Sequence, residues 1–339
     1  MILSGFREDY TKNRWKPSRI PGVAFGRESL PAVAGRPGPV SRPGGTGCEI
    51  LGRQTMPIHY AVLLGALQGL TEFVPVSSTA HLYLAQALLR IRNDEIALSF
   101  DVVLHLGTAL ALAAALWRDV LSMLTELPLW VAGRPARDPQ ARALLAPLIV
   151  GTLPGVLAGL FLLKRFEAAR TLGLIGISML VACAYFFFSE KSAAGRAGAE
   201  RPLTRLNLAD GLLIGLAQAA AGLLAGFSRS GFTIATGLNR GLRREEAARF
   251  SFLLGLPLIA GAGGKALLDL RHEQGSAVGG PALVAGFLAA AIVGFVTVRL
   301  LLRFLKRHTL RPFAIYLGLL GATLFAWSVA RGLPLLAGS

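Results

Sequence analysis

Charged side chains are scarce in this sequence, and acidic ones are the scarcest. Only 16% of the 339 residues are Asp, Glu, Lys or Arg, against roughly 25% in an average soluble domain. Cysteine is nearly absent, since Cys48 and Cys183 are the only two. Their separation matches no metal-site spacing, and one pair of distant cysteines makes no disulfide framework. These absences argue against a soluble, disulfide-stapled or zinc-binding module.

Long apolar segments make up much of the sequence, and hydrophobic residues account for 53% of the chain. Several segments approach the ~20 residues with which a helix crosses a bilayer. Helices are expected over residues 58–71, 77–90, 98–117, 119–132, 144–163, 171–188, 208–224, 229–239, 248–269, 281–302 and 313–330. The composition therefore predicts an all-α, polytopic integral membrane protein.

The formal net charge of +16 comes from Lys and Arg in short connections such as 240–249 and 303–311. Basic residues beside membrane spans attract anionic lipid and set topology, so no nucleic-acid partner is expected. The basic stretches 134–142 and 196–205 are expected on opposite sides of the membrane. On that expectation, charge alone gives no orientation.

Residues 1–55 differ from the rest because they are rich in Arg, Pro and Gly and show no hydrophobic periodicity. They are predicted to be disordered, and they lack the basic start and apolar core of a secretory signal. Met56 opens the first membrane-type segment directly. We expect it to be the natural start, with one membrane-embedded domain over residues 56–339.

Two polar stretches interrupt the apolar segments, residues 68–81 and residues 226–231. The pieces beside each interruption are too short to span a bilayer comfortably. Irregular backbone survives at membrane depth only where protein or trapped water satisfies its polar groups. The sequence therefore predicts two re-entrant or broken helices that meet in the interior.

The two interruptions also resemble each other. Gly65-Ala-Leu-Gln68 precedes the first, Gly215-Leu-Ala-Gln218 precedes the second, and a serine-rich turn follows each. Paired interrupted segments in corresponding halves indicate an internal repeat with a central binding site.

Candidate chemical groups gather in the first stretch. Gln68 and Glu72 are four residues apart and share a helix face, so they predict part of a divalent-cation site. Ser77 and Ser78 follow Pro75 at a helix start, where free N–H groups bind anions. Ser78 and His81 lie one turn apart, and either His81 or a serine could be the nucleophile. The structural alternatives are a capping Glu72, N-capping serines and a packed histidine.

The second stretch supplies a guanidinium, because Arg229 stands between Ser228 and Ser230 and between two glycines. A tight turn there would let the guanidinium grip phosphate with several donors. The alternative is an arginine that snorkels to the membrane interface. On α-helical spacing, Asp101 and His105 form a further pair that could line the same cavity.

These residues resemble the undecaprenyl-diphosphate phosphatases, also called bacitracin-resistance proteins. The first family signature matches the run from Gln68 to His81, and the second matches Ala225-Gly-Phe-Ser-Arg-Ser-Gly231. Further likeness lies in Phe250 to Pro257 and in Pro312 to Tyr316. The resemblance covers residues 56–329 and leaves out the N-terminal stretch. Two departures are Gln68, where the family often has Glu, and Ala225, where it has proline.

The resemblance implies a hydrolase that converts undecaprenyl diphosphate to its monophosphate with a divalent cation, Mg or Ca. It implies recycling of the carrier lipid for peptidoglycan synthesis, cell-wall biogenesis and cell shape, and resistance to the antibiotic bacitracin. It also implies interdigitated inverted repeats, the bacterial inner membrane, an outward-facing site and homodimers. The residues it assigns are the catalytic Glu72, Ser78, His81 and Arg229, the phosphate-binding Ser77, Ser78, Ser228, Arg229 and Ser230, and the metal ligands Glu72 and Gln68.

A second class of function fits the same architecture. Secondary transporters also use inverted repeats and broken helices at the membrane midplane. The chain could therefore move a lipid or an anion, with Arg229 binding rather than catalysing. Soluble phosphatase designs fit less well, because the chain contains no Cys-x5-Arg loop and no Gly-x4-Gly-Lys-Ser/Thr loop.

Overall fold

The structure is a computed structural model that describes residues 56–332 except residues 90, 92–93, 163–170, 197 and 273–277. The described residues form eleven α-helices and one short 3-10 helix, and their one isolated bridge joins Arg201 to Leu242. The all-α prediction is confirmed. The prediction of a disordered extension over residues 1–55 lies outside the described residues.

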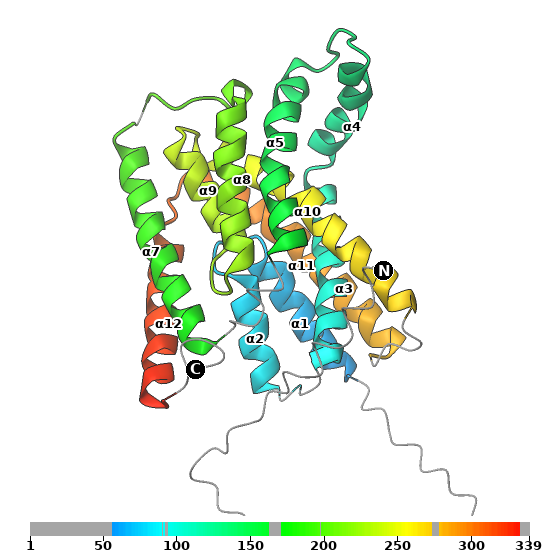
Figure 1. Ribbon diagram of the computed structural model, residues 1–339, viewed down its shortest axis with the longest axis vertical. Coiled ribbons are helices and arrows are strands. Elements are labelled where there is room, and N and C mark those ends of the chain that lie inside the picture. Colours follow the sequence, from blue (N-terminus) through cyan, green and yellow to red (C-terminus); the bar gives the residue numbers. More distant parts are fainter. Residues whose placement is uncertain are drawn as a thin grey trace, which may run out of the picture. The chain divides into compact units, whose positions relative to one another are not determined.

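The helices follow one another along the chain with short connections (Figure 1). They are α1 (Ile58–Thr71), α2 (Ser78–Leu88), α3 (Asp94–Ala115), α4 (Trp117–Val131), α5 (Pro139–Phe161), α7 (Leu172–Ala194), η2 (Leu203–Arg205), α8 (Leu208–Leu223), α9 (Arg229–Asn239), α10 (Arg244–His272), α11 (Gly280–Leu305) and α12 (Arg311–Ala330). All eleven expected segments coincide with a helix. Helix α10 begins four residues before the expected 248, because Glu245 and Glu246 occupy its first turn, where acidic side chains favour a helix start.

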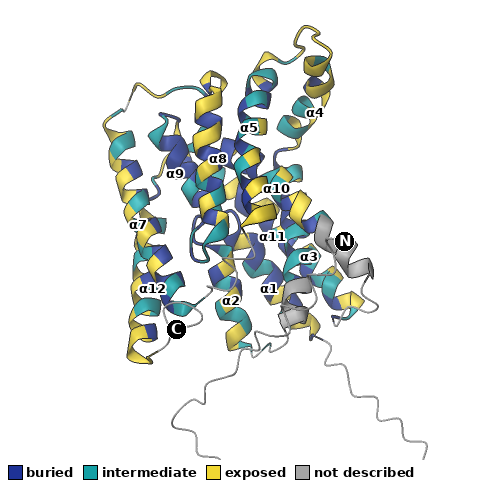
Figure 2. Ribbon diagram, in the orientation of Figure 1, coloured by how far each residue is buried: buried dark blue, intermediate teal, exposed yellow. Residues whose placement is uncertain are grey.

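Five helices are long and apolar enough to cross a membrane, namely α5, α7, α10 over Arg244–Gly264, α11 and α12. Helices α3 and α4 make a sixth candidate, but an 84° bend separates Phe100–Ala115 from Trp117–Val131. The sequence predicted two separate segments here and gave no sign of that bend. Many large hydrophobic side chains on the outer helices are exposed (Figure 2), as a lipid-facing surface requires. The chain is a multi-pass membrane protein.

Two pairs of short helices reverse direction inside the protein (Figure 1). In that view α1 rises from the lower end to the middle and α2 returns, while α8 descends from the upper end and α9 returns. The breaks fall at residues 72–77 and 224–228, where the sequence predicted them. The first hairpin comprises α1 and α2, the second comprises α8 and α9, and they enter from opposite ends.

Glycines in equivalent positions of the two hairpins support the predicted repeat. Helix α1 packs on α11, and a Cβ at Gly65 would lie 2.3 Å from the carbonyl oxygen of Gly286. Helix α8 packs on α5, and a Cβ at Gly215 would lie 2.1 Å from the oxygen of Gly151. Small residues that let helix backbones touch are typical of membrane interfaces. Each hairpin thus packs on a helix of the other half, and the halves interdigitate.

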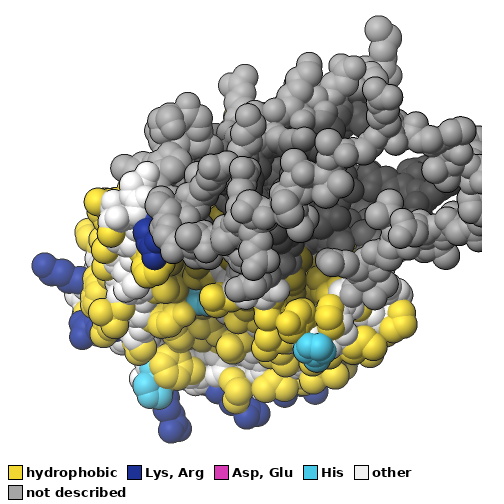
Figure 3. Space-filling model, turned by 90° about the horizontal axis from the view of Figure 1, so that it is seen from below, with side chains coloured by type: hydrophobic (Ala, Val, Ile, Leu, Met, Phe, Trp, Pro, Cys, Tyr) yellow, Lys and Arg dark blue, Asp and Glu magenta, His cyan; other side chains and the backbone are white. Residues whose placement is uncertain are grey.

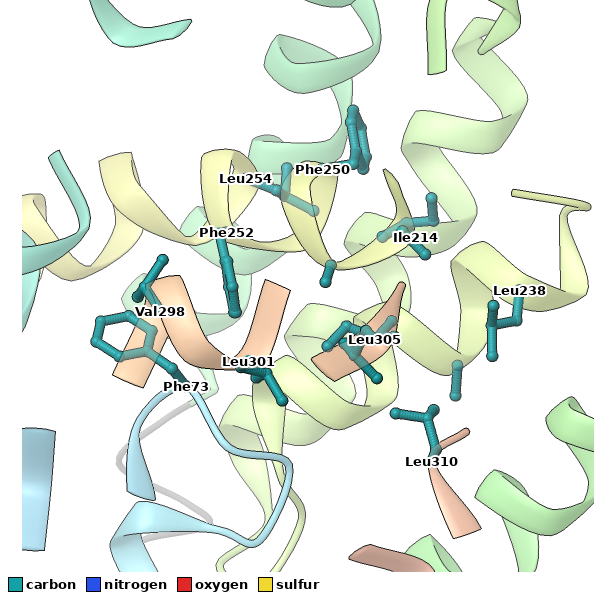
Figure 4. Packing of buried hydrophobic residues seen from close by; sticks show 14 of the residues in the cluster. Phe73, Ile214, Leu238, Phe250, Phe252, Leu254, Val298, Leu301, Leu305 and Leu310 are labelled. Atoms are coloured by element: carbon teal, nitrogen blue, oxygen red, sulfur yellow. The ribbon is translucent and has the colours of Figure 1, made fainter. Parts of the chain in front are cut away.

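The hydrophobic core holds the first break in place (Figure 4). Phe73 follows Glu72 directly, is completely buried, and meets Phe252 of α10 edge-to-face with ring centroids 5.6 Å apart. Val298 and Leu301 of α11 lie beside these rings and are also buried. Because Phe73 is fixed on one side of the turn, the carboxylate of Glu72 is held on the other.

Four basic junctions lie together at one end of the protein. Figure 1 shows the α4–α5 and α7–α8 junctions at the same, upper end. Arg201 N–H donates to Gly241 O at 2.8 Å, which ties in the α9–α10 junction. Buried Glu190 accepts from Leu310 N at 2.7 Å and pairs with Arg244, which adds the α11–α12 junction. The expectation that 134–142 and 196–205 lie on opposite sides is therefore wrong.

The opposite end looks different. Seen from below the view of Figure 1, the side chains coloured in Figure 3 are mainly hydrophobic, with Lys and Arg at the edge.

Candidate active site

The carboxylate of Glu72 joins the two hairpins. It lies just beyond α1 and is 7% exposed. Its Oε2 accepts hydrogen bonds from Ser78 Oγ at 2.7 Å and Gln68 Nε2 at 3.0 Å. Its Oε1 accepts from Arg229 Nη2 of the second hairpin at 2.9 Å. One buried carboxylate therefore contacts three of the predicted site residues.

The first turn presents these groups because of its local sequence. The Glu72 N–H donates to Gln68 O, so the last helical turn places both side chains on one face, as their spacing predicts. Pro75 lacks an N–H and ends the helical ladder. Ser77 then takes φ 72°, a conformation that side chains rarely adopt, and α2 begins at Ser78.

The second turn is shaped differently. Gly226 has φ 98°, and a Cβ there would lie 2.6 Å from Ile175 O. Ser228 caps α9 by accepting from the Gly231 N–H at 3.2 Å, and it hydrogen-bonds to Ser230 at the same distance. Both serines are buried. Ser228 is thus an N-cap, and phosphate binding by Ser228 and Ser230 stays a prediction.

Arg229 points inward from the first position of α9. Its side chain is 14% exposed and pairs with Glu72, so it does not snorkel to an interface. A Cβ at Gly231 would lie 2.9 Å from Pro75, which shows how closely the two breaks approach.

Several buried polar atoms at this place have no hydrogen-bond partner among the described residues. They are Arg229 Nη1, Gln68 Oε1 and Ser77 Oγ. Ser77 does not cap α2 with its side chain, so the capping alternative is wrong for this residue. The N-terminus of α2 thus lacks a side-chain cap, an arrangement that binds anions, whereas Arg229 Nη1 lies against Gly255 of α10.

His81 is engaged by other groups than the Ser78 hydroxyl expected beside it. Its Nδ1 lies 2.8 Å from Ser77 O, and its Nε2 lies 2.7 Å from the hydroxyl of Tyr316 on α12. Ser78 is paired with Glu72 instead. The sequence singled out Tyr316 only through a family likeness, and no local spacing signals a partner 235 residues away.

Of the further pair on α3, one member reaches the site. His105 Nε2 lies 3.8 Å from Glu72 Oε2. Asp101 is turned to Gln86, whose Nε2 donates to it at 2.7 Å. The structure thus brings Gln68, Glu72, Ser77, Ser78, His105 and Arg229 together.

Comparison with protein families gives a match over residues 61–323 to the bacitracin resistance protein BacA family. The chain belongs to this family. It is 44% identical over 259 residues to an undecaprenyl-diphosphatase of Rubrobacter xylanophilus, which covers 76% of this chain and 93% of that protein. An undecaprenyl-diphosphatase of Moorella thermoacetica is 39% identical over 276 residues, 80% of this chain and 98% of its own. One from Methanosphaera stadtmanae is 35% identical over 282 residues, with 79% and 97% covered.

The site of this BacA-family chain offers few protein ligands to a metal. No group of three or more His, Cys, Asp or Glu side chains suited to a metal occurs among the described residues. The oxygen atoms that could bind a metal are those of the Glu72 carboxylate and the unpaired Gln68 Oε1. That set fits a hard cation that takes its other ligands from substrate and water, and does not fit a cage made by protein alone.

Proposed function

We propose that the protein hydrolyses undecaprenyl diphosphate to undecaprenyl phosphate and inorganic phosphate. The family and the names of its relatives support this substrate. The observation that carries the chemistry is the hydrogen bond of Ser78 Oγ to Glu72, whose carboxylate is also paired with Arg229. A hydroxyl beside a buried carboxylate base, which is itself paired with a guanidinium, suits phosphoryl transfer.

Ser78 is the nucleophile in this proposal. Its Oγ attacks the terminal phosphorus and passes its proton to Glu72 Oε2, while the bond from that phosphorus to the bridging oxygen breaks. Undecaprenyl phosphate leaves with the bridging oxygen and takes up the proton. Water then attacks the phosphoserine and gives a proton through Glu72 to the Ser78 oxygen, which releases phosphate.

The engagement of both His81 nitrogens argues against His81 as the nucleophile. Nδ1 is held by the Ser77 carbonyl and Nε2 by the Tyr316 hydroxyl, whereas Ser78 already contacts a base. We assign His81 to proton handling beside Ser78. The Arg229 guanidinium, Ser77 Oγ and the N–H groups at the start of α2 bind the transferring phosphate in this proposal.

We also propose Mg²⁺ or Ca²⁺ as cofactor, held by Glu72 and Gln68 Oε1. The cation would neutralise charge on the diphosphate. Chelator is expected to lower phosphate release, and added Mg²⁺ or Ca²⁺ to restore it; release that is indifferent to chelator would contradict the cofactor.

The distribution of basic residues supports a location for the protein and an orientation in the membrane. Basic residues mark cytoplasmic loops, and the described basic residues of the four grouped junctions are Arg134, Arg137, Arg142, Arg196, Arg201, Arg205, Arg240, Arg243, Lys306 and Arg307. We place this end in the cytoplasm of a bacterial inner membrane. The first hairpin lies between the break and the other end (Figure 1), and we propose that the site opens at that end, outside the cell, where the carrier lipid is recycled. Homodimerisation stays a prediction from the family resemblance.

The transport alternative has weaker support. The relatives compared are named for hydrolysis, and a serine paired with a carboxylate has no necessary part in binding alone.

The test is phosphate release from undecaprenyl diphosphate by purified protein, comparing wild type with Ser78→Ala. The matched control is Ser122→Ala on α4, whose hydroxyl contacts Asp138. We expect Ser78→Ala to lower kcat by at least about 100-fold and Ser122→Ala to match wild type. Wild-type protein that binds the lipid without releasing phosphate would overturn the proposal.

A further inference from the structure

We propose that Tyr316 is a positioning residue that fixes the ring of a neutral His81 by donating to Nε2, while the Ser77 carbonyl holds the proton on Nδ1. This inference rests on the proposed function, because it concerns how His81 handles protons beside Ser78. It goes further by assigning a task to a residue on α12, outside both hairpins.

The hydrogen bonds of the imidazole determine which nitrogen carries the proton. The Ser77 carbonyl, 2.8 Å from His81 Nδ1, can only accept, so Nδ1 carries hydrogen. The neutral ring then has its lone pair on Nε2, where the Tyr316 hydroxyl donates at 2.7 Å. The rings are also stacked, with centroids 5.7 Å apart and planes 18° apart. Two bonds and one stacking contact therefore select one tautomer and one ring orientation.

This contact is one of few between its helices. Helix α12 packs chiefly on α7, and α2 chiefly on α1, so neither helix holds the imidazole through close packing with the other. Tyr316 is 43% exposed, so packing of its ring in the protein interior does not explain why a tyrosine stands here. The hydroxyl reaching Nε2 is the specific feature of this side chain.

The phenol can also follow a change of protonation. When His81 Nε2 takes up a proton it becomes a donor, and the Tyr316 hydroxyl turns from donor to acceptor without moving its ring. The pair can therefore keep its geometry in both protonation states. Phenylalanine would keep the stacking and lose this property.

A matched control comes from the neighbouring helix. Tyr185 lies on α7, the packing partner of α12, and its hydroxyl bonds to Thr236 Oγ1 at 2.8 Å and Asn239 Nδ2 at 3.3 Å. Tyr185→Phe removes the same atom from a hydrogen-bonded tyrosine in α7. It should leave His81 and the reaction unchanged.

The experiment combines kinetics with ¹⁵N spectra of histidine-labelled protein. The chain has five histidines, and loss of a signal in His81→Asn identifies His81. We expect the Nδ1-protonated tautomer in all three proteins, because the Ser77 carbonyl is kept, and a changed Nε2 signal only in Tyr316→Phe, where Nε2 loses its hydrogen bond. Tyr316→Phe should lower kcat about tenfold, shift its pH profile and leave KM nearly unchanged. In a His81→Asn background it should have no further effect.

Two outcomes would overturn the inference. One is an unchanged Nε2 signal in Tyr316→Phe, and the other is an equal loss of kcat from Tyr316→Phe in the wild-type and the His81→Asn protein. If wild-type protein released no phosphate, the proposed function would fail, and the spectra would still show whether Tyr316 bonds to His81.

Discussion

Ser77 carries the clearest conflict between stability and function at the scale of single residues. It has φ 72°, its buried hydroxyl finds no partner among the described residues, and it leaves α2 without a side-chain cap. Strained backbone costs on the order of 1–3 kcal/mol and gathers at functional sites. Ser228 holds the corresponding place in the second hairpin and does cap its helix. Only the first hairpin leaves its helix start free for an anion.

Ser77→Ala should raise the stability of the protein and lower its activity. Removing an unpaired buried hydroxyl is expected to raise the free energy of unfolding by about 1 kcal/mol, while loss of a phosphate donor lowers kcat/KM about tenfold. Thermal unfolding and phosphate release measure the two effects.

The control is Ser328→Ala on α12, which also removes a buried hydroxyl without a partner among the described residues. It should gain similar stability and keep full activity. Equal loss of activity in both variants would show that Ser77 has no part in binding phosphate.

Local spacing was enough to predict some contacts and useless for others. Gln68 and Glu72 are one turn apart, so helix geometry alone places them together. Arg229 meets Glu72 across 157 residues, and only the likeness of the two breaks suggested that they converge. The pairing of Ser78 with Glu72 and of His81 with Tyr316 could not be predicted, because the turn conformation at Ser77 and the place of α12 decide these contacts.

At the scale of elements, the second hairpin depends on a close approach of backbone. Gly226 sits at φ 98° against Ile175 O and the Ser178 side chain of α7. The break and its glycine were predicted from the sequence, but this contact was not, because no local pattern indicates that α7 lies behind the turn. Ala225, where the family has proline, leaves Gly226 as the residue that sets the bend.

Gly226→Ala should therefore disturb the hairpin. Alanine is unfavourable at positive φ and its Cβ would overlap Ile175 O, so we expect a loss of roughly 2 kcal/mol or more in the free energy of unfolding. Phosphate release per folded molecule should fall as well, because Arg229 follows three residues later. Thermal unfolding in detergent gives the first quantity.

Gly222→Ala is the matched control four residues earlier. It is helical, and nothing lies within 4 Å of its Cβ position, so alanine should stabilise α8 by up to about 1 kcal/mol. If the two variants behaved alike, the close approach at Gly226 would not be what shapes the turn.

At the scale of the whole molecule, the fold class followed from composition, whereas orientation required the structure. The apolar segments predicted the helices because membrane spans need length and little charge. The basic stretches 134–142 and 196–205 were expected on opposite sides, since the sequence left open whether α1–α2 and α8–α9 are broken spans or re-entrant segments that return to their starting side. Once both hairpins are recognised, the four basic junctions gather at one end.

Cysteine labelling in whole cells tests that orientation. In a protein with Cys48 and Cys183 replaced by serine, we expect Arg137→Cys, at the basic end, to resist a membrane-impermeant maleimide until the cells are permeabilised. Leu88→Cys, at the exposed end of α2, should react in intact cells. The reverse pattern would place the site on the cytoplasmic side.

The central claim is that the two hairpins form one hydrolytic site through Glu72 and Arg229. The most direct measurement is a double-mutant cycle on kcat/KM for phosphate release with Glu72→Gln, Arg229→Lys and the double variant. Each single change should cost about 10²- to 10³-fold. Because the residues act as a unit, the double variant should fall close to the worse single variant. A loss equal to the product of the two single losses would show that they act independently and would contradict the account.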